Sequence, residues 1–566
     1  MLWDKKRSIH NIEARWTVDE LEKFQDSIPH LIKDLFNIAL HIPNVSRELA
    51  LTIAQSGYRF QDILYKAACL DEGDFTDRRL FIYVDGKHGP LGNIMNAPWD
   101  KLLVQNQLFS VVNYKIKNDF WDVLTTHGVS KWKRFRLAGY ETIIYRLAVK
   151  FFNILPNRLF TKELLMPNEN EINIEIASAL VLRGVKITKI QNKPSPNDQK
   201  TRISKNRALL FKELELVMRR RVEQWITPSG VEVVMSLFLS HIEERIKEFE
   251  RLTNEWDVVI AQSDVRKKSA VLVNASGNIR GHSLAYSCRK KNIPLISSQH
   301  GITVEIKNTK HMLDIDFDNS VADVMLSYNS KIINVEKKSY FDKSKHYEIG
   351  MPLRLIRMKN ISTVMSESPP IVFISTNLYH IGLSQSPRTN YINARFEQEI
   401  VVDILSKLPH KVRYKTYPED NRRHADMDPV LSDVNKADNI ELFSKKIDMR
   451  YLISEHRILI TTCATSTLGW PVMSNKPVVF INQSRNKALS DEALISLSKG
   501  IFVFSDDEKD FYKTIVIFLS QPIEEIERIW QKKEGARKKM VKKYFSKYNG
   551  GAGKRAAKII LEECLV

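Results

Sequence analysis

From about residue 161 onward, short apolar runs alternate with helical patterns, and this alternation constrains the fold more than any other feature of the chain. A short apolar run between two helical patterns is typical of a buried strand in a parallel sheet. The runs that we interpret as strands lie at 163–166, 185–190, 256–260, 293–297, 323–327 and 347–349, and then at 371–375, 412–416, 440–442, 457–461, 477–481 and 501–504. The alternation predicts an α/β protein.

A linker divides this alternation into two halves. Residues 356–370 end in Ser-Glu-Ser-Pro-Pro, a composition that favours a linker over a helix or strand. We therefore expect two Rossmann-like domains with parallel sheets, at 159–355 and 371–530, facing each other across a cleft. Ligands of such sheets bind at the carboxyl ends of the strands, so the cleft is the expected site.

The two ends of the chain have a different character. Residues 1–158 read as a mostly helical section, because apolar residues between Leu21 and Ile38 recur at spacings of three and four. A strand is expected at 80–84 and a helix at 131–153. Residues 531–566 read as a basic C-terminal helix or tail.

The net charge of +19 is concentrated near the C-terminus, where residues 531–558 hold eleven Lys and Arg against one acid. Such a run is either a solvated helix end or a surface that attracts anionic lipid. Nucleic acid is a third reading, but the chain has no RNP-like motif, zinc finger or obvious helix-turn-helix. We expect an anionic membrane surface, and no nucleic acid, as the partner of this segment.

Cysteine usage and hydropathy indicate the compartment. The four cysteines are far apart in sequence and form no CxxC pair, which argues against a disulfide scaffold and a cysteine-based zinc site. No apolar run approaches the roughly 20 residues of a membrane-spanning helix, and the first residues lack the apolar core of a signal peptide. We expect a cytoplasmic protein, at most peripheral on the inner membrane face. We also expect no metal and no cofactor.

The sharpest local motif is Ser297-Ser-Gln-His-Gly301, which follows an apolar strand. At the carboxyl end of a strand, Gln299 and His300 point towards the cleft, and Gly301 lets the backbone turn. His300 is a candidate to transfer a proton or to donate a hydrogen bond to an anion. The alternative is a histidine that only satisfies the backbone of the turn.

Three carboxylates are candidates to join His300. Asp264 follows the expected strand at 256–260, one strand-helix-strand step before the histidine, and suits a general base or a nucleophile. The alternative for Asp264 is a helix N-cap. Glu169 and Glu171 lie in the first loop, where the alternative is the acidic first turn of a helix.

In the second half, two loops are candidates to bind a nucleotide. In Tyr414-Lys-Thr-Tyr-Pro-Glu419, Lys415 suits a phosphate and Glu419 suits a ribose or a base; a surface turn is the alternative. A hydroxyl-rich turn at 461–469 precedes a helix start, which is a physical basis for phosphate binding, with simple N-capping as the alternative. The candidate phosphate ligands there, and in the loop at 375–377, are Thr465, Ser466, Thr467, Ser375 and Asn377.

These motifs, in this order, resemble bacterial surface-carbohydrate glycosyltransferases of the GT-B fold. The resemblance covers roughly 161–530 and is closest to the β-Kdo and related CMP-sugar transferases of capsule and lipopolysaccharide assembly. The segments that carry it are Ser297-Ser-Gln-His-Gly301, Gly350-Met-Pro352, Lys415-Thr-Tyr-Pro-Glu419, Thr461 to Pro471 and Lys476-Pro-Val-Val479. A fainter resemblance is to the CDP-glycerol glycerophosphotransferases of teichoic acid synthesis. The basic or His-Pro element that is usual in the family's second half reads here as Lys-Thr-Tyr-Pro.

The resemblance implies a role for each candidate. Asp264 would be the nucleophile, His300 the histidine of the Gln-His-Gly motif, and one of Glu169 and Glu171 its acidic partner. The residues that would bind the CMP part are Lys415, Glu419, Ser466 and Thr467. The expected reaction moves an acidic eight- or nine-carbon sugar from a CMP donor, without a metal, to a saccharide or lipid-linked glycan acceptor. The alternatives are transfer of glycerol phosphate from CDP-glycerol and a non-enzymatic protein that binds polyanions.

Overall fold

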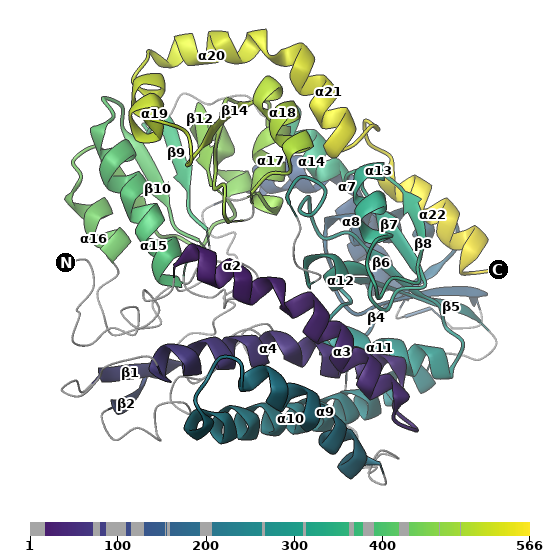
Figure 1. Cartoon of the computed structure of the whole chain (residues 1–566). Helices are drawn as coiled ribbons and strands as arrows, with labels where there is room; N and C mark the ends of the chain where they lie inside the picture. Colours follow the sequence, from purple (N-terminus) through teal and green to yellow (C-terminus); the bar gives the residue numbers. More distant parts are fainter. Residues whose placement is uncertain are drawn as a thin grey trace.

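Figure 1 shows the computed structural model, in which two α/β halves of the chain lie beside a helical N-terminal section. The structure describes residues 17–71, 80–85, 109–114, 129–152, 154–155, 159–192, 206–262, 267–308, 313–360, 367–376, 378, 390–417, 429–462, 464–486 and 488–566. None of the helices in these ranges has both the length and the hydropathy needed to cross a bilayer.

The first α/β half contains a six-stranded sheet in which every pair of neighbours is parallel, in the order β4-β3-β5-β6-β7-β8. The interior strands are buried on both faces, which explains why they read as apolar runs without alternation. In register, Leu164 lies opposite both Ile187 and Ala270. The strands are β3 (Lys162–Met166), β4 (Lys186–Lys189), β5 (Lys268–Asn274), β6 (Leu295–Ser298), β7 (Val324–Ser327) and β8 (Lys345–Glu348).

The second half contains another six-stranded parallel sheet, in the order β11-β10-β9-β12-β13-β14. The strand order switches at β9: β10 and β11 follow on one side of it, and β12, β13 and β14 on the other. In register, Phe373 of β9 lies opposite both Tyr414 and Ile460. The strands are β9 (Ile371–Ile374), β10 (Val412–Lys415), β11 (Ile440–Phe443), β12 (Ile458–Thr461), β13 (Val478–Asn482) and β14 (Phe502–Ser505). The predicted pair of Rossmann-like sheets, arranged as in the GT-B fold, is confirmed.

One predicted strand is wrong. Residues 256–260 form the last turn of the 34-residue helix α10 (Pro228–Ala261), and the third strand along this half of the chain is β5, which we did not predict. The apolar run is misleading because Trp256, Val259 and Ile260 are buried at helical spacing, in a core cluster that the N-terminal helices, β5 and α11 share. Asp264 therefore follows a helix and precedes β5, so it does not stand at the carboxyl end of a strand.

The helices match the expected pattern in most places. The predicted helical N-terminal section is present and packs on α10, as the purple and teal helices at the lower side of Figure 1 show. A parallel pair of short strands, β1 (Leu80–Asp85) and β2 (Phe109–Tyr114), accompanies it. Through the first half, the helices are α2 (Val18–Asp26), α3 (Ile28–His41), α4 (Arg47–Asp71), α7 (Lys131–Phe152), α8 (Glu171–Val181), α9 (Arg207–Val222), α10, α11 (Ile279–Lys290), α12 (Leu313–Asn319), α13 (Ser330–Glu336) and α14 (Leu353–Arg357).

In the second half the predicted helix at 395–408 is α15 (Asn390–Glu399), continued by a π-helical turn and a 3₁₀ turn. The predicted helix at 448–455 is two 3₁₀ turns, Met449–Tyr451 and Ile453–Glu455. The remaining helices are α16 (Pro429–Lys436), α17 (Ser466–Met473), α18 (Asp491–Gly500), α19 (Phe511–Leu519), α20 (Ile523–Lys532), α21 (Glu534–Tyr544) and α22 (Ala552–Glu563).

The C-terminal helices run from the second half back to the first, as the yellow segment in Figure 1 shows. The N–H of Gly553 in α22 donates to Glu175 of α8, and Arg555 donates to the carbonyl of Ile349 beside β8. Lys543 pairs with Glu492, and the Arg537 guanidinium lies 3.8 Å from the centre of the Trp530 ring. Several cations of the basic C-terminal segment therefore have a structural role, and its membrane role stays a prediction.

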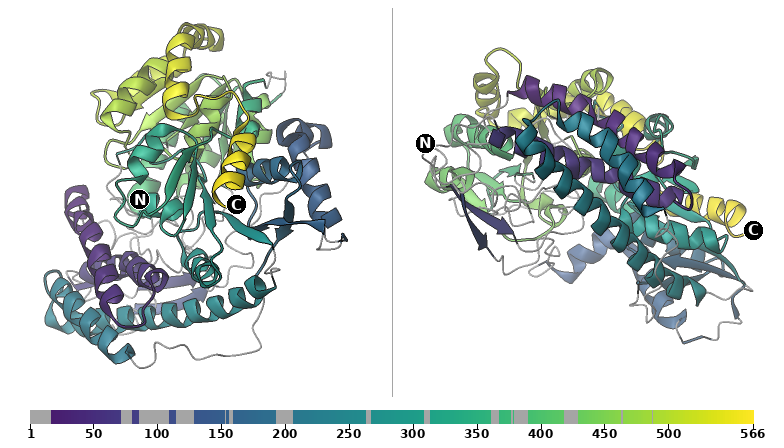
Figure 2. Two further views of the ribbon diagram at one scale, coloured as in Figure 1. Left: turned by 90° about the vertical axis from the view of Figure 1, so that its right-hand side faces the viewer. Right: turned by 60° about the horizontal axis from the view of Figure 1, so that its bottom comes forward.

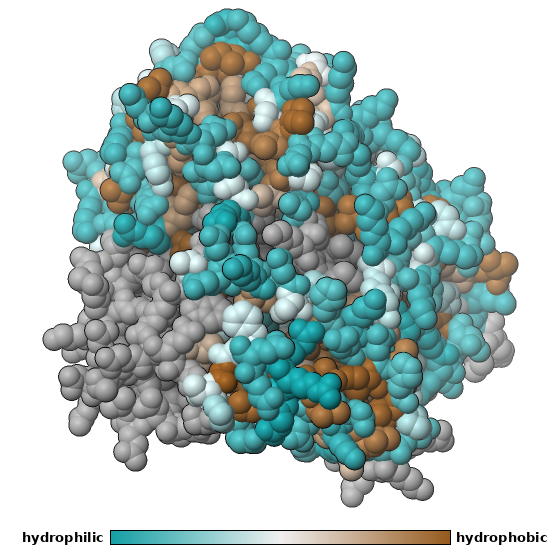
Figure 3. Space-filling model, in the orientation of Figure 1, coloured by the Kyte–Doolittle hydropathy of each residue, from teal (hydrophilic) through white to brown (hydrophobic). Residues whose placement is uncertain are grey.

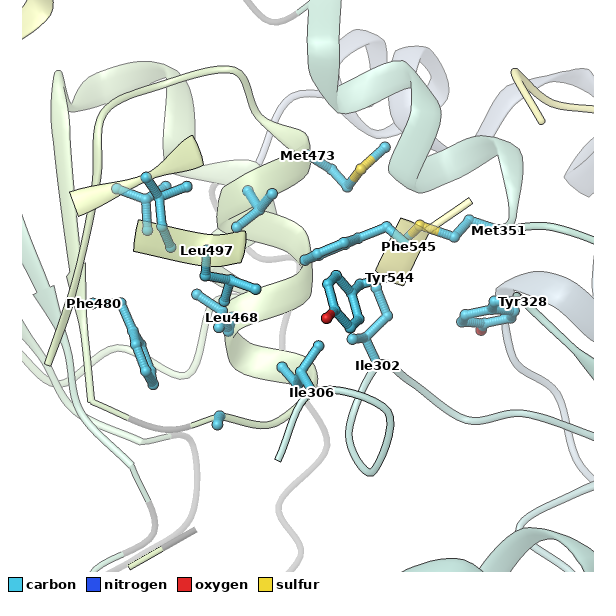
Figure 4. Close-up of a cluster of buried hydrophobic side chains, with 14 of the residues drawn as sticks. Ile302, Ile306, Tyr328, Met351, Leu468, Met473, Phe480, Leu497, Tyr544 and Phe545 are labelled. Carbon is cyan, nitrogen blue, oxygen red and sulfur yellow. The ribbon is translucent and has the colours of Figure 1, made fainter. Parts of the chain in front are cut away.

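The two halves share a continuous apolar core. Figure 4 shows Ile302 and Ile306, from the loop after β6, beside Leu468 of α17 and Tyr544 of α21. A Cβ added at Gly469 would lie 3.4 Å from Ile302, and both residues line the cleft between the halves, so the two halves approach closely there. The face shown in Figure 3 is mainly hydrophilic, with apolar areas that gather towards its top and its lower right.

Candidate functional site

A cleft of about 320 Å³ lies between the two sheets, and both halves of the chain line it. The first half contributes residues from the loops that follow β3, β6, β7 and β8, and the second half contributes residues at or after the ends of β9, β10, β11 and β12. The lining residues are Glu171, His300, Gly301, Ile302, Tyr328, Met351, Leu355, Ile374, Ser375, Lys415, Thr416, Tyr417, Asp448, Met449, Arg450, Ser466, Thr467, Gly469 and Trp470. The cleft thus stands at the carboxyl ends of both sheets, where the fold predicts a ligand.

On the side of the first half, an aspartate orients a histidine. The His300 Nδ1 lies 2.9 Å from both carboxylate oxygens of Asp318, and the His300 backbone N–H donates to the same carboxylate. Asp318 is buried, and the Phe317 ring meets the imidazole edge-on at 5.2 Å. A carboxylate on Nδ1 fixes the tautomer that carries a proton there, so proton transfer by this ring runs through Nε2.

The turn after β5 holds Asp318 in place. Ser276 donates to the Asp318 carbonyl at 2.9 Å, and the Gly277 N–H donates to the Phe317 carbonyl at 2.7 Å. A Cβ at Gly277 would lie only 1.9 Å from the Asp316 carbonyl oxygen, so only glycine permits this approach. Asp318 belongs to the acidic run at 314–318, whose spacing lacks the features of a calcium-binding loop and so did not indicate a role.

On the side of the second half, Lys415 ends β10 with its side chain almost fully buried, at 2 % exposure. Its Nζ donates to the Thr416 carbonyl at 2.7 Å and lies 5.8 Å from the Phe443 ring centre. Among the described residues it has no carboxylate in salt-bridge contact. Burial lowers the pKa of Lys415 to about 8, against the opposing effect of Asp448. A buried cation whose hydrogen bond among the described residues goes to a carbonyl favours the binding of an anion.

Helix α17 points its N-terminus into the same cleft. Thr465 is the N-cap and accepts from the Thr467 N–H, while Ser466 and Thr467 line the cleft. The first N–H groups of a helix lack intrahelical acceptors and carry a partial positive charge, so they suit a phosphate. Ser375 also lines the cleft, and its hydroxyl donates to Glu397 at 2.5 Å.

Gly301 brings the histidine loop against this helix. A Cβ at Gly301 would lie 2.7 Å from the Ser466 Cβ, a distance that forces the two halves to shift. We expect Gly301→Ala to lower the free energy of unfolding by about 1–3 kcal/mol through overpacking. Denaturant titration measures this, with Gly535→Ala on α21, where a Cβ meets nothing within 4 Å, as the matched control. Equal stability of the two variants would contradict this contact.

Four charged residues join the halves at one edge of the cleft. Arg354 donates to Glu171 at 2.9 Å and to Asp448 at 3.2 Å, and Arg450 contacts the same two carboxylates. Burial would raise the pKa of Asp448, but Arg450 and Arg354 outweigh it and hold that pKa below its usual range. The sequence motifs indicated Glu171 but not the other three residues of this cluster, because they lie in short helical turns that carry no signal of their own.

The other predicted site residues lie elsewhere. Glu169 does not line the cleft: it accepts from Tyr145 at 2.7 Å and pairs with Lys189 at 2.5 Å. Gln299 is fully buried beneath the loop, where it donates to the Gly301 carbonyl and accepts from the Tyr328 N–H. Asp264, Glu419 and Asn377 lie outside the described residues.

A metal was not expected, and the described residues offer no group of three or more His, Cys, Asp or Glu that is placed to hold one. The carboxylates nearest the cleft, Glu171 and Asp448, are already paired with arginines.

Comparisons with known proteins leave the family open. No protein-family model matches the chain, and no curated protein matches it in sequence. Similar solved structures include MurG of Acinetobacter baumannii (11 % identity, TM-score 0.34, covering 71 % of this chain and 99 % of that one) and the UDP-GlcNAc 2-epimerase of Methanocaldococcus jannaschii (11 %, 0.39, 71 % and 99 %). Another is UGT89C1 of Arabidopsis thaliana in complex with UDP-L-rhamnose (9 %, 0.38, 72 % and 100 %). At these values the likeness decides nothing about activity, so the function is argued from the cleft.

Proposed function

We propose that the chain is a glycosyltransferase that binds a nucleotide-sugar donor in the cleft. The observation that carries this proposal is that one cleft joins the Asp318-held His300 of the first half to Lys415 and the N-terminus of α17 in the second. A proton acceptor facing an anion site is what displacement of a phosphate leaving group requires.

The chemistry follows from these positions. The Nε2 of His300 takes the proton from an acceptor hydroxyl, and the hydroxyl oxygen attacks the anomeric carbon of the donor. The bond from that carbon to the phosphate oxygen breaks, and its electron pair leaves with the nucleotide. Lys415 and the first N–H groups of α17 offset the negative charge that develops on the phosphate. This route uses a histidine base where the sequence suggested Asp264 as a nucleophile, and it inverts the anomeric configuration.

The donor is proposed to be CMP-linked and to carry an acidic sugar of the Kdo or nonulosonate type, with a bacterial surface glycan as acceptor. Support comes from the order of the Ser-Gln-His-Gly, Lys-Thr-Tyr-Pro-Glu and hydroxyl-rich segments, which resembles the CMP-sugar transferases. No contact of the described residues distinguishes cytosine from uracil.

Donor screening tests this assignment. We expect turnover of CMP-linked sugars in a panel of CMP-, UDP-, GDP- and CDP-linked substrates, measured by release of the nucleotide. A strong preference for a UDP-sugar would remove the CMP assignment and leave glycosyl transfer intact. Transfer of glycerol phosphate from CDP-glycerol, with no glycosidic bond in the product, would instead replace the proposed reaction.

A further inference from the structure

Helix α7 exposes a concentrated row of apolar side chains. Of the eighteen large apolar side chains that the described part of the chain exposes, nine lie between Trp132 and Leu159. After the kink at Gly139, four of them recur at helical spacing and form one stripe. The nine, which we call the α7 patch, are Trp132, Phe135, Tyr140, Ile143, Leu147, Phe151, Ile154, Leu155 and Leu159.

Cations surround this patch. Helix α7 holds six Lys and Arg and a single acid, Glu141. That acid is buried and paired with Arg357 at 2.6 Å, so it contributes little negative charge to the exposed face. Lys131, Arg136, Arg146 and Lys150 are exposed beside the apolar side chains.

The inner face of α7 is anchored to both halves beside the cleft. Leu137 is buried with Ile374 and Met449, two residues that also line the cleft. Tyr145 packs on the first half and donates to Glu169. The blue helices that stand out at the edge of the left view of Figure 2 include this element. The α7 patch thus lies on the outer face of α7. The opposite face of the same helix packs behind the cleft.

We propose that the α7 patch docks on an anionic phospholipid bilayer, with α7 lying in the interface. Exposed Trp, Tyr, Phe and aliphatic side chains with Lys and Arg alongside are the composition of an interfacial helix, and the cations complement anionic headgroups. Aromatic residues and arginine are also common in protein–protein interfaces, whereas lysine is depleted there, so Lys131 and Lys150 favour the bilayer. Aliphatic residues such as Ile143 and Leu147 add nothing to nucleic acid binding, which depends on charge and stacking.

Docking of the α7 patch on a bilayer does not depend on which reaction the cleft performs. If the proposed function also holds, the bilayer would bring the cleft close to a lipid-linked acceptor. The C-terminal basic segment is the weaker candidate for the same role, since Lys543, Lys547 and Arg537 are engaged in contacts within the fold.

Vesicle co-sedimentation of the full chain tests the proposal. We expect binding to vesicles of phosphatidylglycerol and phosphatidylcholine and none to phosphatidylcholine alone. The triple variant Ile143→Ser, Leu147→Ser, Phe151→Ser should lose at least about tenfold in vesicle affinity, and so should Arg146→Glu with Lys150→Glu. All five side chains are exposed, so the melting temperature should stay unchanged.

Two matched controls make the outcome decisive. Leu209→Ser with Leu216→Ser removes exposed leucines of α9, and Lys539→Glu with Lys542→Glu removes exposed cations of α21. Both control variants should bind vesicles as the unaltered chain does. The proposal is wrong if the unaltered chain does not bind anionic vesicles, if the α7 variants bind as well as it does, or if only the α21 variant loses binding. It is also wrong if the α7 patch instead holds two copies of the chain together, seen as a dimer that the triple variant dissociates without a change in vesicle binding.

Discussion

His300→Ala should lower kcat for glycosyl transfer by a factor on the order of 10²–10⁴, the range typical of a lost general base. The physical reason is that the Asp318 carboxylate, whose oxygens lie 2.9 Å from Nδ1, keeps the ring proton on Nδ1. Nε2 is then the atom that takes the proton of the acceptor hydroxyl. Donor affinity should change little, because the proposed phosphate contacts come from Lys415 and α17. Product formation under saturating donor and a separate donor titration measure the two effects.

The conservative variant His300→Asn separates catalysis from folding. Its side-chain amide can take the place of Nδ1 and donate to Asp318, but it has no group in the place of Nε2. It should therefore keep the melting temperature of the unaltered chain and be as inactive as the alanine variant. His30→Asn, an exposed position on α3, serves as the control that should change nothing. Retained kcat in His300→Asn would mean that the histidine only satisfies the loop backbone, and the proposed mechanism would fall.

The sheets were predictable because parallel strands are buried on both faces. Such strands appear in the sequence as apolar runs, which can be recognised without knowledge of tertiary contacts. β12 and β13 illustrate this, since each of their residues is buried. The run at 256–260 failed because an amphipathic helix that ends on β-branched residues produces the same local pattern. Only the packing of Trp256 and Ile260 as one face of a helix, in the core that the N-terminal helices share with β5 and α11, reveals the difference.

The site was predictable only in part, for a related reason. His300, Lys415 and Ser466 each lie at or shortly after the carboxyl end of a strand, so the rule that strand ends meet in the cleft was enough to group them. Asp318 reaches the histidine through α12, and Arg450 reaches Glu171 from the other half of the chain. Contacts such as those of Asp318 and Arg450 depend on how the elements pack against one another. The spacing of residues along the chain does not reveal that packing.

Lys415→Met should weaken donor binding by about 10- to 100-fold, the loss expected when a charge-assisted contact to a phosphate is removed. The same lysine should make donor affinity depend on pH. Burial lowers its pKa to about 8, so the free protein loses this cation as the pH rises through that value. The dissociation constant should therefore be flat well below pH 8 and increase above it. A donor phosphate with one ester to the nucleoside and one to the sugar has no proton to lose in that range, so the change belongs to the protein.

Lys415→Arg distinguishes charge from shape. A guanidinium stays protonated at every pH of the experiment, so this variant should bind donor with an affinity that no longer falls above pH 8. Isothermal titration with the donor found by screening, repeated on both sides of pH 8, measures all three proteins. If the unaltered chain bound donor equally at every pH, or if Lys415→Met bound as tightly as it does, the buried lysine would be a structural residue. The anion site would then have to be rebuilt from the N-terminus of α17 alone, which supplies polarity but no full charge to meet a phosphate.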